Sequence, residues 1–95
     1  MSCHHESDCS QLVILVADGA GKTSRARLCH ARWWQVLGVT TGGYRVWVTY
    51  GDTTAQIDTV AGGLHSVAYV GMGGDIFVSL DNMQPGATAF IGVSR

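Results

Sequence analysis

The stretch that most constrains the fold is Tyr44 to Thr59, because it contains two alternating runs joined by a short turn. Gly51-Asp52 can adopt the positive φ values of a tight turn, and the alternation resumes from Ala55. A period of two is the pattern of a β-strand, so the stretch predicts a β-hairpin. In the first run the two predicted faces are Tyr44, Val46, Val48 and Tyr50 on one side, and Arg45, Trp47 and Thr49 on the other.

The rest of the chain repeats this rhythm of short runs and glycine-containing turns. It predicts an all-β fold, a small antiparallel β-sandwich with six or seven strands, in which residues 11–95 form a single domain. Residues 1–10 have no hydrophobic period and predict a flexible N-terminal arm. Gln11 to Ala17 is a continuous apolar run, which predicts a central strand covered on both faces. The other runs of strand length are Leu64 to Val70, Asp75 to Leu80 and Ala87 to Ser94.

The segment from Ser24 to Gly38 has two interpretations. As a helix it would begin with Ser24 as the N-cap and end at Gly38. As a strand it has alternating residues from Arg25 onward, followed by a break near Trp33-Trp34. We expect a strand, because the neighbouring segments are all strands.

Val16 to Thr23 is the stretch closest to a known catalytic motif, because it ends like a phosphate-binding loop. Val16 stands where such a loop has its first glycine, and the chain is too short for the parallel sheet and crossover helices of a nucleotide hydrolase. Several aspartates lie in or beside turns, where aspartate is ordinary, and no serine lies at a strand-to-helix elbow. We therefore expect no enzyme activity, no catalytic residue and no cofactor.

Possible metal ligands gather near the N-terminus, and Cys29-His30 could complete a zinc site with them. The spacing of Cys3 and Cys9 matches no common zinc finger, so we expect no metal-binding residue. The chain has three cysteines, an odd number, and free thiols are expected in a reducing compartment. The N-terminal ligand types are those of Cys3, His4, His5, Glu6, Asp8 and Cys9.

The composition indicates a protein that contacts other proteins. Charged residues make up 14 % of the chain, against a usual share of about 25 %. From Thr59 to Arg95 the charged residues are Asp75, Asp81 and Arg95. So little charge indicates that apolar surface is covered by another protein. The net charge of −1 does not favour nucleic acid, and no apolar run is long enough to cross a membrane.

Trp47 is the most informative aromatic residue, because it shares a predicted strand face with Arg45 and Thr49. An aromatic ring beside an arginine on a polar face suits a protein interface or a platform on which a sugar stacks. We expect a protein interface, with Arg45, Trp47, Phe77 and Phe90 as its candidate residues.

Three segments, Gly43 to Tyr50, Asp75 to Leu80 and Pro85 to Val93, together resemble the second half of a small jelly-roll sandwich. Such domains occur as carbohydrate-binding modules and as decoration, cement or fibre domains on the heads and tails of tailed bacteriophages. The resemblance implies a jelly-roll-like fold and carries over no site residue.

Two functions follow as expectations from the resemblance. The first is a non-enzymatic structural protein of a virus particle, a capsid decoration or cement protein or a tail-associated subunit. It would be a homo-oligomer bound to a larger shell protein and made in the host cytoplasm. The alternative is a carbohydrate-binding β-module. The chain starts with Met1 and shows no secretion signal or linker, which favours the virion protein over a module of a secreted enzyme.

Overall fold

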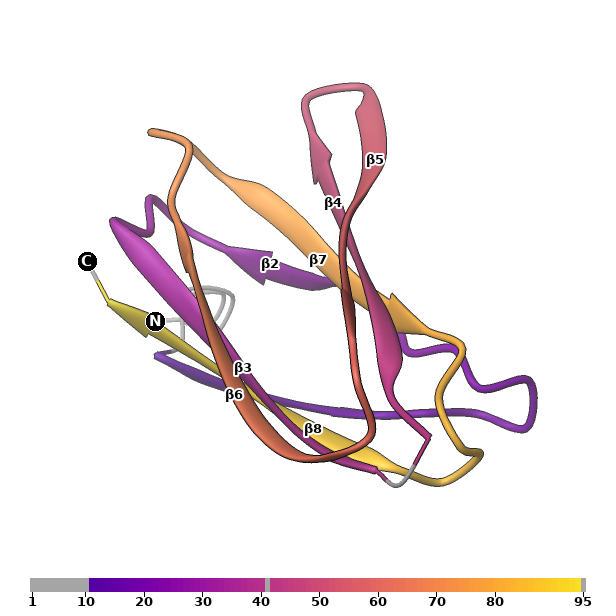
Figure 1. The fold of residues 1–95 in the computed structure, drawn as a ribbon. Helices are drawn as coiled ribbons and strands as arrows, with labels where there is room; N and C mark the ends of the chain where they lie inside the picture. The colour runs from indigo at the N-terminus through magenta and orange to yellow at the C-terminus, as the bar shows by residue number, and fades with distance from the viewer. Residues whose placement is uncertain (1–10, 41, 95) are drawn as a thin grey trace, which may run out of the picture.

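The computed structural model describes residues 11–40 and 42–94, which form two antiparallel four-stranded sheets and no helix (Figure 1). The strand orders are β1-β8-β3-β6 in one sheet and β2-β7-β4-β5 in the other. The all-β, antiparallel prediction is confirmed, although the described residues contain eight strands rather than six or seven. The strands are β1 (Leu12–Val16), β2 (Ala26–Leu28), β3 (Trp33–Thr40), β4 (Tyr44–Tyr50), β5 (Thr53–Val60), β6 (Gly63–Val70), β7 (Ile76–Asp81) and β8 (Thr88–Ser94). The predicted arm, residues 1–10, lies outside the described residues.

The predicted β4–β5 hairpin is confirmed, and it is the midpoint of the strand pairing. Gly51 has a φ of 64° in the turn between the two strands. Moving outward from this turn, β4 pairs with β5, β3 with β6, β2 with β7 and β1 with β8. The chain therefore pairs like one long hairpin folded over into two layers.

The ambiguous segment is strand, as expected, and the helical interpretation is wrong. It forms two strands, β2 and β3, which belong to different sheets. The break lies before Trp33, where His30 has a φ of 49°. A positive φ is uncommon for a residue other than glycine, and here it redirects the chain from one layer to the other. This division accounts for the higher strand count.

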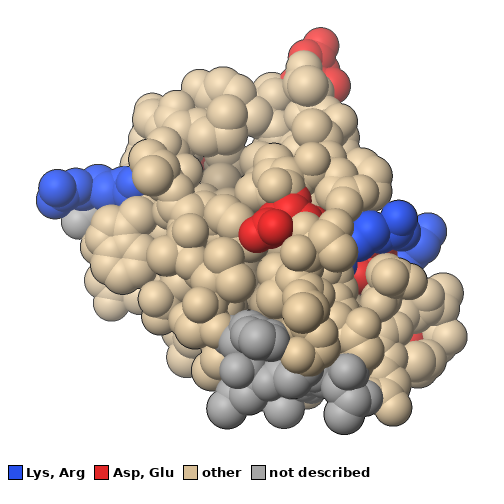
Figure 2. Space-filling model, in the orientation of Figure 1, with Lys and Arg blue, Asp and Glu red and all other residues tan. Residues whose placement is uncertain are grey.

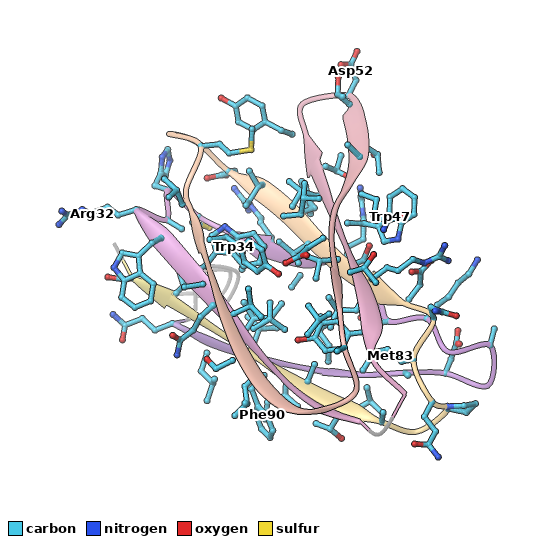
Figure 3. All side chains as sticks on the ribbon, in the orientation of Figure 1. Arg32, Trp34, Trp47, Asp52, Met83 and Phe90 are labelled. Carbon is cyan, nitrogen blue, oxygen red and sulfur yellow. The ribbon has the colours of Figure 1, made fainter. Side chains whose placement is uncertain are left out.

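The core lies between the two sheets and is built from alternate residues of each strand. Trp34 and Tyr44 are its largest fully buried side chains, and Figure 3 shows Trp34 between the layers. Gly38 leaves the space that the Tyr44 ring fills, since a Cβ at Gly38 would overlap that ring. The other large side chains that are fully buried are Leu28, Val36, Val46, Ile76, Val78, Leu80 and Ile91.

A β-bulge alters the second strand of the hairpin. The register shifts between Val46 and Trp47, so that Val46 pairs with Asp58 and Trp47 with Gln56, leaving Ile57 without a partner in the ladder. Asp58 consequently faces between the sheets, where its Oδ2 accepts a hydrogen bond of 2.8 Å from the Tyr69 hydroxyl. The strict alternation predicted from Ala55 to Thr59 is therefore wrong, because a bulge inserts an extra residue on one strand.

The prediction that Gln11–Ala17 is a central strand is wrong. β1 lies at the edge of its sheet and pairs only with β8 among the described residues. One face of β1 contributes Leu15 to the core, while the other face is exposed.

No stretch of the described residues forms a helix of the length and hydropathy needed to span a membrane.

Candidate functional site

The four predicted interface residues lie on two different surfaces. Arg45, Trp47 and Phe77 alternate with buried residues of β4 and β7 and face outward from the β2-β7-β4-β5 sheet. Phe90 faces outward from the other sheet, between Ile14 and Leu37 in the strand register. Figure 3 shows Trp47 and Phe90 on opposite sides of the sandwich. One partner surface therefore cannot contact all four residues.

The outer side of the β2-β7-β4-β5 sheet is polar and aromatic, and we call it the polar-aromatic face. Charged, hydroxyl and amide side chains surround its two aromatic rings. Its residues are Arg25, Arg27, Arg45, Trp47, Thr49, Thr54, Gln56, Thr59, Phe77, Ser79 and Asp81.

Asp81 is the central hydrogen-bond acceptor of the polar-aromatic face. The Arg45 guanidinium donates Nε to Asp81 Oδ1 at 2.8 Å and Nη2 to Oδ2 at 2.9 Å, a bidentate pair. Trp47 Nε1 also donates to Oδ1, at 2.9 Å. The three side chains are neighbours because Arg45 pairs directly with Asp81 across β4 and β7, and Trp47 follows two residues later on the same face of β4. The network fixes the orientation of the Trp47 indole.

The network also sets the protonation state of Asp81. Partial burial disfavours the carboxylate, but hydrogen bonds from Arg45 and Trp47, together with the positive charge of Arg45, hold the pKa of Asp81 below its ordinary value. Asp81 is therefore ionised at neutral pH.

The second aromatic ring of this face, Phe77, is covered by a cation. The guanidinium carbon of Arg25 lies 4.5 Å from the centroid of the Phe77 ring. Beside it Arg27 Nη2 donates to Asp75 Oδ2 at 2.6 Å, and this hydrogen bond lowers the pKa of Asp75. Two arginines of the polar-aromatic face are therefore paired with acids of the same chain, Arg27 with Asp75 and Arg45 with Asp81.

The outer side of the β1-β8-β3-β6 sheet has the opposite character, and we call it the apolar face. In β1 the exposed fractions are 58 % for Leu12, 56 % for Ile14 and 57 % for Val16. The outward-facing residues whose side chains the structure describes include no charged residue. They are Leu12, Ile14 and Val16 of β1, Thr88, Phe90, Gly92 and Ser94 of β8, Trp33, Gln35 and Leu37 of β3, and Ser66, Ala68 and Val70 of β6.

The low surface charge is visible in Figure 2, where the coloured side chains are few and scattered over a mostly uncharged surface.

Sequence reasoning selected Phe90 from the apolar face but missed its β1 residues. The run from Leu12 to Val16 gave the necessary pattern, since a continuous apolar segment needs cover on both sides. The sequence did not show that the residues on one of those sides are exposed in the folded chain.

The phosphate-loop-like stretch forms a turn between β1 and β2. Asp18 Oδ1 accepts hydrogen bonds from the backbone N–H groups of Ala20 (2.8 Å) and Lys22 (3.0 Å), and these lower the pKa of Asp18. Gly21, with a φ of 78°, packs against the backbone of Met83. The amides that a phosphate would need are therefore used by a carboxylate of the turn itself.

The candidate metal ligands at the N-terminus lie outside the described residues. Within residues 11–40 and 42–94, no cluster of three or more His, Cys, Asp or Glu could hold a metal ion. Cys29 is buried and disulfide-bonded, so the expectation of a free thiol is wrong at this position and its sulfur is not available to zinc. The other half of the disulfide is not among the described residues.

Comparisons of this chain with protein-family models, with curated proteins and with solved structures each found no match.

Proposed function

We propose that this chain is a non-enzymatic structural subunit that acts by protein–protein assembly, with the apolar face as its contact surface. The observation that carries the proposal is the combination of exposed Leu12, Ile14 and Val16 with the absence of charge among the described outward-facing residues of that sheet. Exposed apolar patches on soluble monomers rarely exceed a few hundred Å². A contiguous face of this composition is typical of surfaces that are covered in an assembly.

The size of the apolar face suits a specific interface. Four strands about 4.8 Å apart and about 20 Å long give a projected area on the order of 400 Å². The accessible surface of a corrugated sheet is larger than its projected area. The accessible area of this face therefore approaches the roughly 800 Å² per partner of an ordinary stable interface. The aromatic residues Trp33 and Phe90 lie within this area, and aromatic side chains supply much of the binding energy of interfaces.

The strand order supports a jelly roll as the finer description of the sandwich. The orders β1-β8-β3-β6 and β2-β7-β4-β5 follow from one long hairpin rolled into two sheets. Eight-stranded jelly rolls are found in viral capsid proteins and in lectins. Within the class of assembly subunits, this topology favours a virion protein, a decoration, cement or tail-associated subunit that contacts itself and a larger shell protein.

Size-exclusion chromatography with light scattering tests the proposal. The wild-type chain should elute as a dimer or larger assembly at micromolar concentration. Ile14→Lys, which puts a charge at the centre of the exposed side of β1, should give a monomer with unchanged circular dichroism. Thr54→Lys, an exposed strand position on the polar-aromatic face, should assemble like the wild type. A wild-type chain that stays monomeric at high concentration would contradict self-assembly.

A second candidate function, carbohydrate binding, is favoured by the orientation of Trp47. Its indole is fixed by Asp81 on an open strand face, next to the polar side chains of Thr49 and Gln56. Sugars stack on such rings and bind adjacent carboxylate and amide groups. Glycan-array screening of the wild type and of Trp47→Ala tests this function. Saturable binding by the wild type that the variant lacks would establish it, and binding that survives in the variant would exclude Trp47 as the platform.

A further inference from the structure

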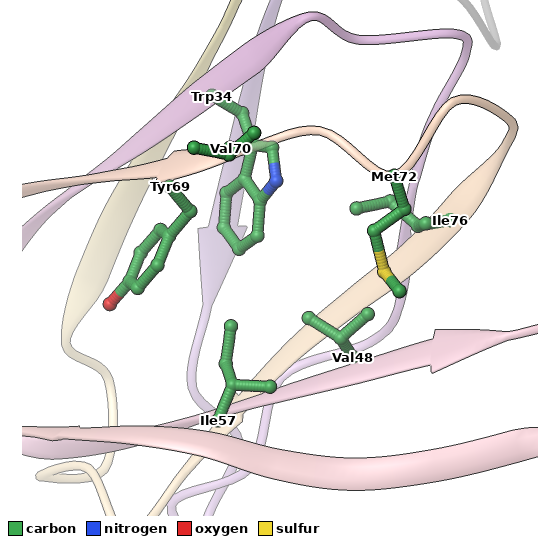
Figure 4. A pocket seen from close by; sticks show the side chains of 7 residues that line it. All are labelled: Trp34, Val48, Ile57, Tyr69, Val70, Met72 and Ile76. Atoms are coloured by element: carbon green, nitrogen blue, oxygen red, sulfur yellow. The ribbon is translucent and has the colours of Figure 1, made fainter.

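A cavity of about 220 Å³ lies between the two sheets, on the side where the edge strands β5 and β6 meet (Figure 4). Side chains from five strands and from the β6–β7 connection surround it. The bulge at Ile57 contributes to it by turning this unpaired residue toward the cavity. The lining residues are Trp34, Val48, Ile57, Tyr69, Val70, Met72 and Ile76.

The mouth of the cavity consists of exposed apolar side chains. Ile57, Val70 and Met72 are all exposed, with Val70 reaching 81 %. Apolar side chains this exposed contribute little to the stability of the chain itself, because little of their surface is removed from water. Met72 is unbranched and flexible, which lets an opening of this kind adapt to what enters.

Two polar groups belong to the cavity wall, and only one of them has a partner. The Tyr69 hydroxyl donates to Asp58 at 2.8 Å. Trp34 is only 1 % exposed, and its indole Nε1 has no hydrogen-bond acceptor among the described residues. In Figure 4 this nitrogen lies on the edge of the indole that is turned toward Met72 and Ile76. A buried N–H group without an acceptor is rare in folded proteins, because it loses its bond to water and gains nothing in return.

Water does not satisfy this donor well. A buried water molecule needs two to four polar partners, and the cavity lining offers the Trp34 N–H beside side chains that are otherwise apolar or already bonded. A molecule with an apolar body and one acceptor oxygen would satisfy the N–H and fill the remaining volume.

We propose that this cavity binds a small neutral aromatic molecule whose carbonyl or ether oxygen accepts a hydrogen bond from Trp34 Nε1. An apolar cavity of about 150 Å³ accommodates benzene, so the volume here of about 220 Å³ fits one ring with a short substituent. A neutral ligand is required, because the seven lining residues include no charged side chain to pair with an ion. The site adjoins the apolar face at Val70, which belongs to both, but it does not depend on the proposed assembly function.

Titration followed by nuclear magnetic resonance tests the site directly. The chain has three tryptophans, and their indole N–H groups give separate signals. Acetophenone is the probe, and cumene is its control, because a methyl group replaces the carbonyl oxygen at nearly constant shape. Acetophenone should shift the Trp34 indole signal saturably and leave the Trp47 signal in place. Cumene should enter without the downfield shift that a new hydrogen bond causes.

Two matched substitutions locate the binding. Ile57→Phe fills the cavity from an exposed position and should weaken acetophenone binding at least tenfold. Ile14→Phe makes the same change on the apolar face, at a similarly exposed isoleucine, and should leave the affinity unchanged. Trp34→Phe removes the donor of the hydrogen bond to the carbonyl oxygen. This substitution should weaken the binding of acetophenone about 2- to 12-fold more than the binding of cumene, the range expected for one net hydrogen bond.

The shift of the Trp34 signal in the wild type keeps the test independent of whether Trp34→Phe folds. Absence of a saturable Trp34 shift up to the solubility of acetophenone would overturn the proposal. An identical indole shift with cumene would overturn the assigned hydrogen bond, and binding unaffected by Ile57→Phe would place the ligand elsewhere.

Discussion

Asp81 shows how a single residue organises a surface. It accepts two hydrogen bonds from Arg45 and one from Trp47, so its carboxylate holds a cation and an aromatic ring in fixed positions. Its partners come from the neighbouring strand, so the arrangement depends on the register of β4 and β7. The polar-aromatic face is therefore preorganised in the folded chain.

Replacing Asp81 should loosen the polar-aromatic face without unfolding the protein. Asp81→Asn keeps the size of the side chain but removes the charge and one acceptor oxygen. Hydrogen bonds to charged groups contribute about 1.5 to 3 kcal/mol when buried, and the partial exposure of Arg45 reduces this to about 1 kcal/mol. Urea unfolding should show this loss, and Asp52→Asn at the exposed hairpin tip should show none. A stability equal to the wild type would contradict the structural role.

Acidification should have a related effect. The pKa of Asp81 is lowered in the folded state, so its contribution is fully present above the unfolded value of about 3.9 and is lost as the pH falls through the folded value. The melting temperature of the wild type should fall between about pH 4 and pH 2. The melting temperature of Asp81→Asn should fall less, because the asparagine side chain does not titrate. The fall that remains in this variant comes from the other acids, such as Asp75. Parallel curves for the two proteins would contradict the assignment.

Gly38 and Gly92 form a matched pair for the packing of the core. A Cβ at Gly38 would overlap the buried Tyr44 ring, whereas at Gly92 the nearest atom is Gln35 Cγ at 3.6 Å, an ordinary contact. Gly38→Ala should cost about 1 to 3 kcal/mol, the range for an overfilled core. Gly92→Ala should be neutral or slightly stabilising, because alanine reduces the freedom of the unfolded chain. Thermal unfolding of both variants tests the comparison, and an equal effect would contradict it.

Among the elements, the β4–β5 hairpin was the most predictable, because alternation and the Gly51-Asp52 turn both specify it locally. The split of residues 24–38 into β2 and β3 was only partly predictable. His30 adopts a positive φ there, and no glycine or proline marks the position. The bulge at Ile57 was not predictable from the pattern of β5, because the register that creates it depends on β4 as well.

β1 shows a different limit of sequence reasoning. Its apolar run correctly predicted a strand, but the expected cover on both faces was wrong. Whether that cover comes from the same chain depends on the sheet order, and β1 is at an edge with one side exposed. The prediction of the interface residues was limited for the same reason, because it also depended on the sheet order. Arg45, Trp47, Phe77 and Phe90 are all outward-facing, but only the pairing of distant strands assigns them to different layers.

The Cys29 disulfide is an element-scale constraint that the sequence pattern did not indicate. The other cysteines of the sequence are Cys3 and Cys9, both outside the described residues. Removing a disulfide from a small domain typically costs about 2 to 5 kcal/mol. Deleting residues 2–9 should lower the melting temperature by about 10 to 20 °C.

Reduction of the intact chain controls for the deletion. A reducing agent should lower the melting temperature of the wild type by a similar amount and leave the deletion variant unchanged. Thiol titration of the unfolded, unreduced protein should find one free thiol per chain, because one disulfide uses two of the three cysteines. Three free thiols would show that the disulfide does not form.

At the scale of the whole molecule, the two outer faces differ in the forces available to them. The apolar face offers hydrophobic contact and no charge among its described residues, while the polar-aromatic face holds Arg25, Arg27 and Arg45. The folding of the chain around the β4–β5 hairpin creates this difference, because consecutive strands other than β4 and β5 lie in opposite layers. A subunit with such faces can contact a copy of itself on one side and a different partner on the other.

Salt should distinguish these two contacts. Between about 0.1 M and 1 M NaCl the Debye length falls from about 10 Å to about 3 Å, which screens interactions between exposed charges. The proposed self-association through the apolar face includes no such interaction among the described residues, so its dissociation constant in sedimentation equilibrium should change less than about threefold. Sodium sulfate should tighten it, because excluded salts favour burial of apolar surface.

The Ile14→Lys variant provides the control, and it should remain monomeric at every salt concentration. An acidic partner bound to the polar-aromatic face should dissociate as NaCl rises, because Arg25 and its neighbours lose their long-range attraction. A self-association that weakens tenfold or more in 1 M NaCl would show that charges, and therefore the opposite face, hold the copies together.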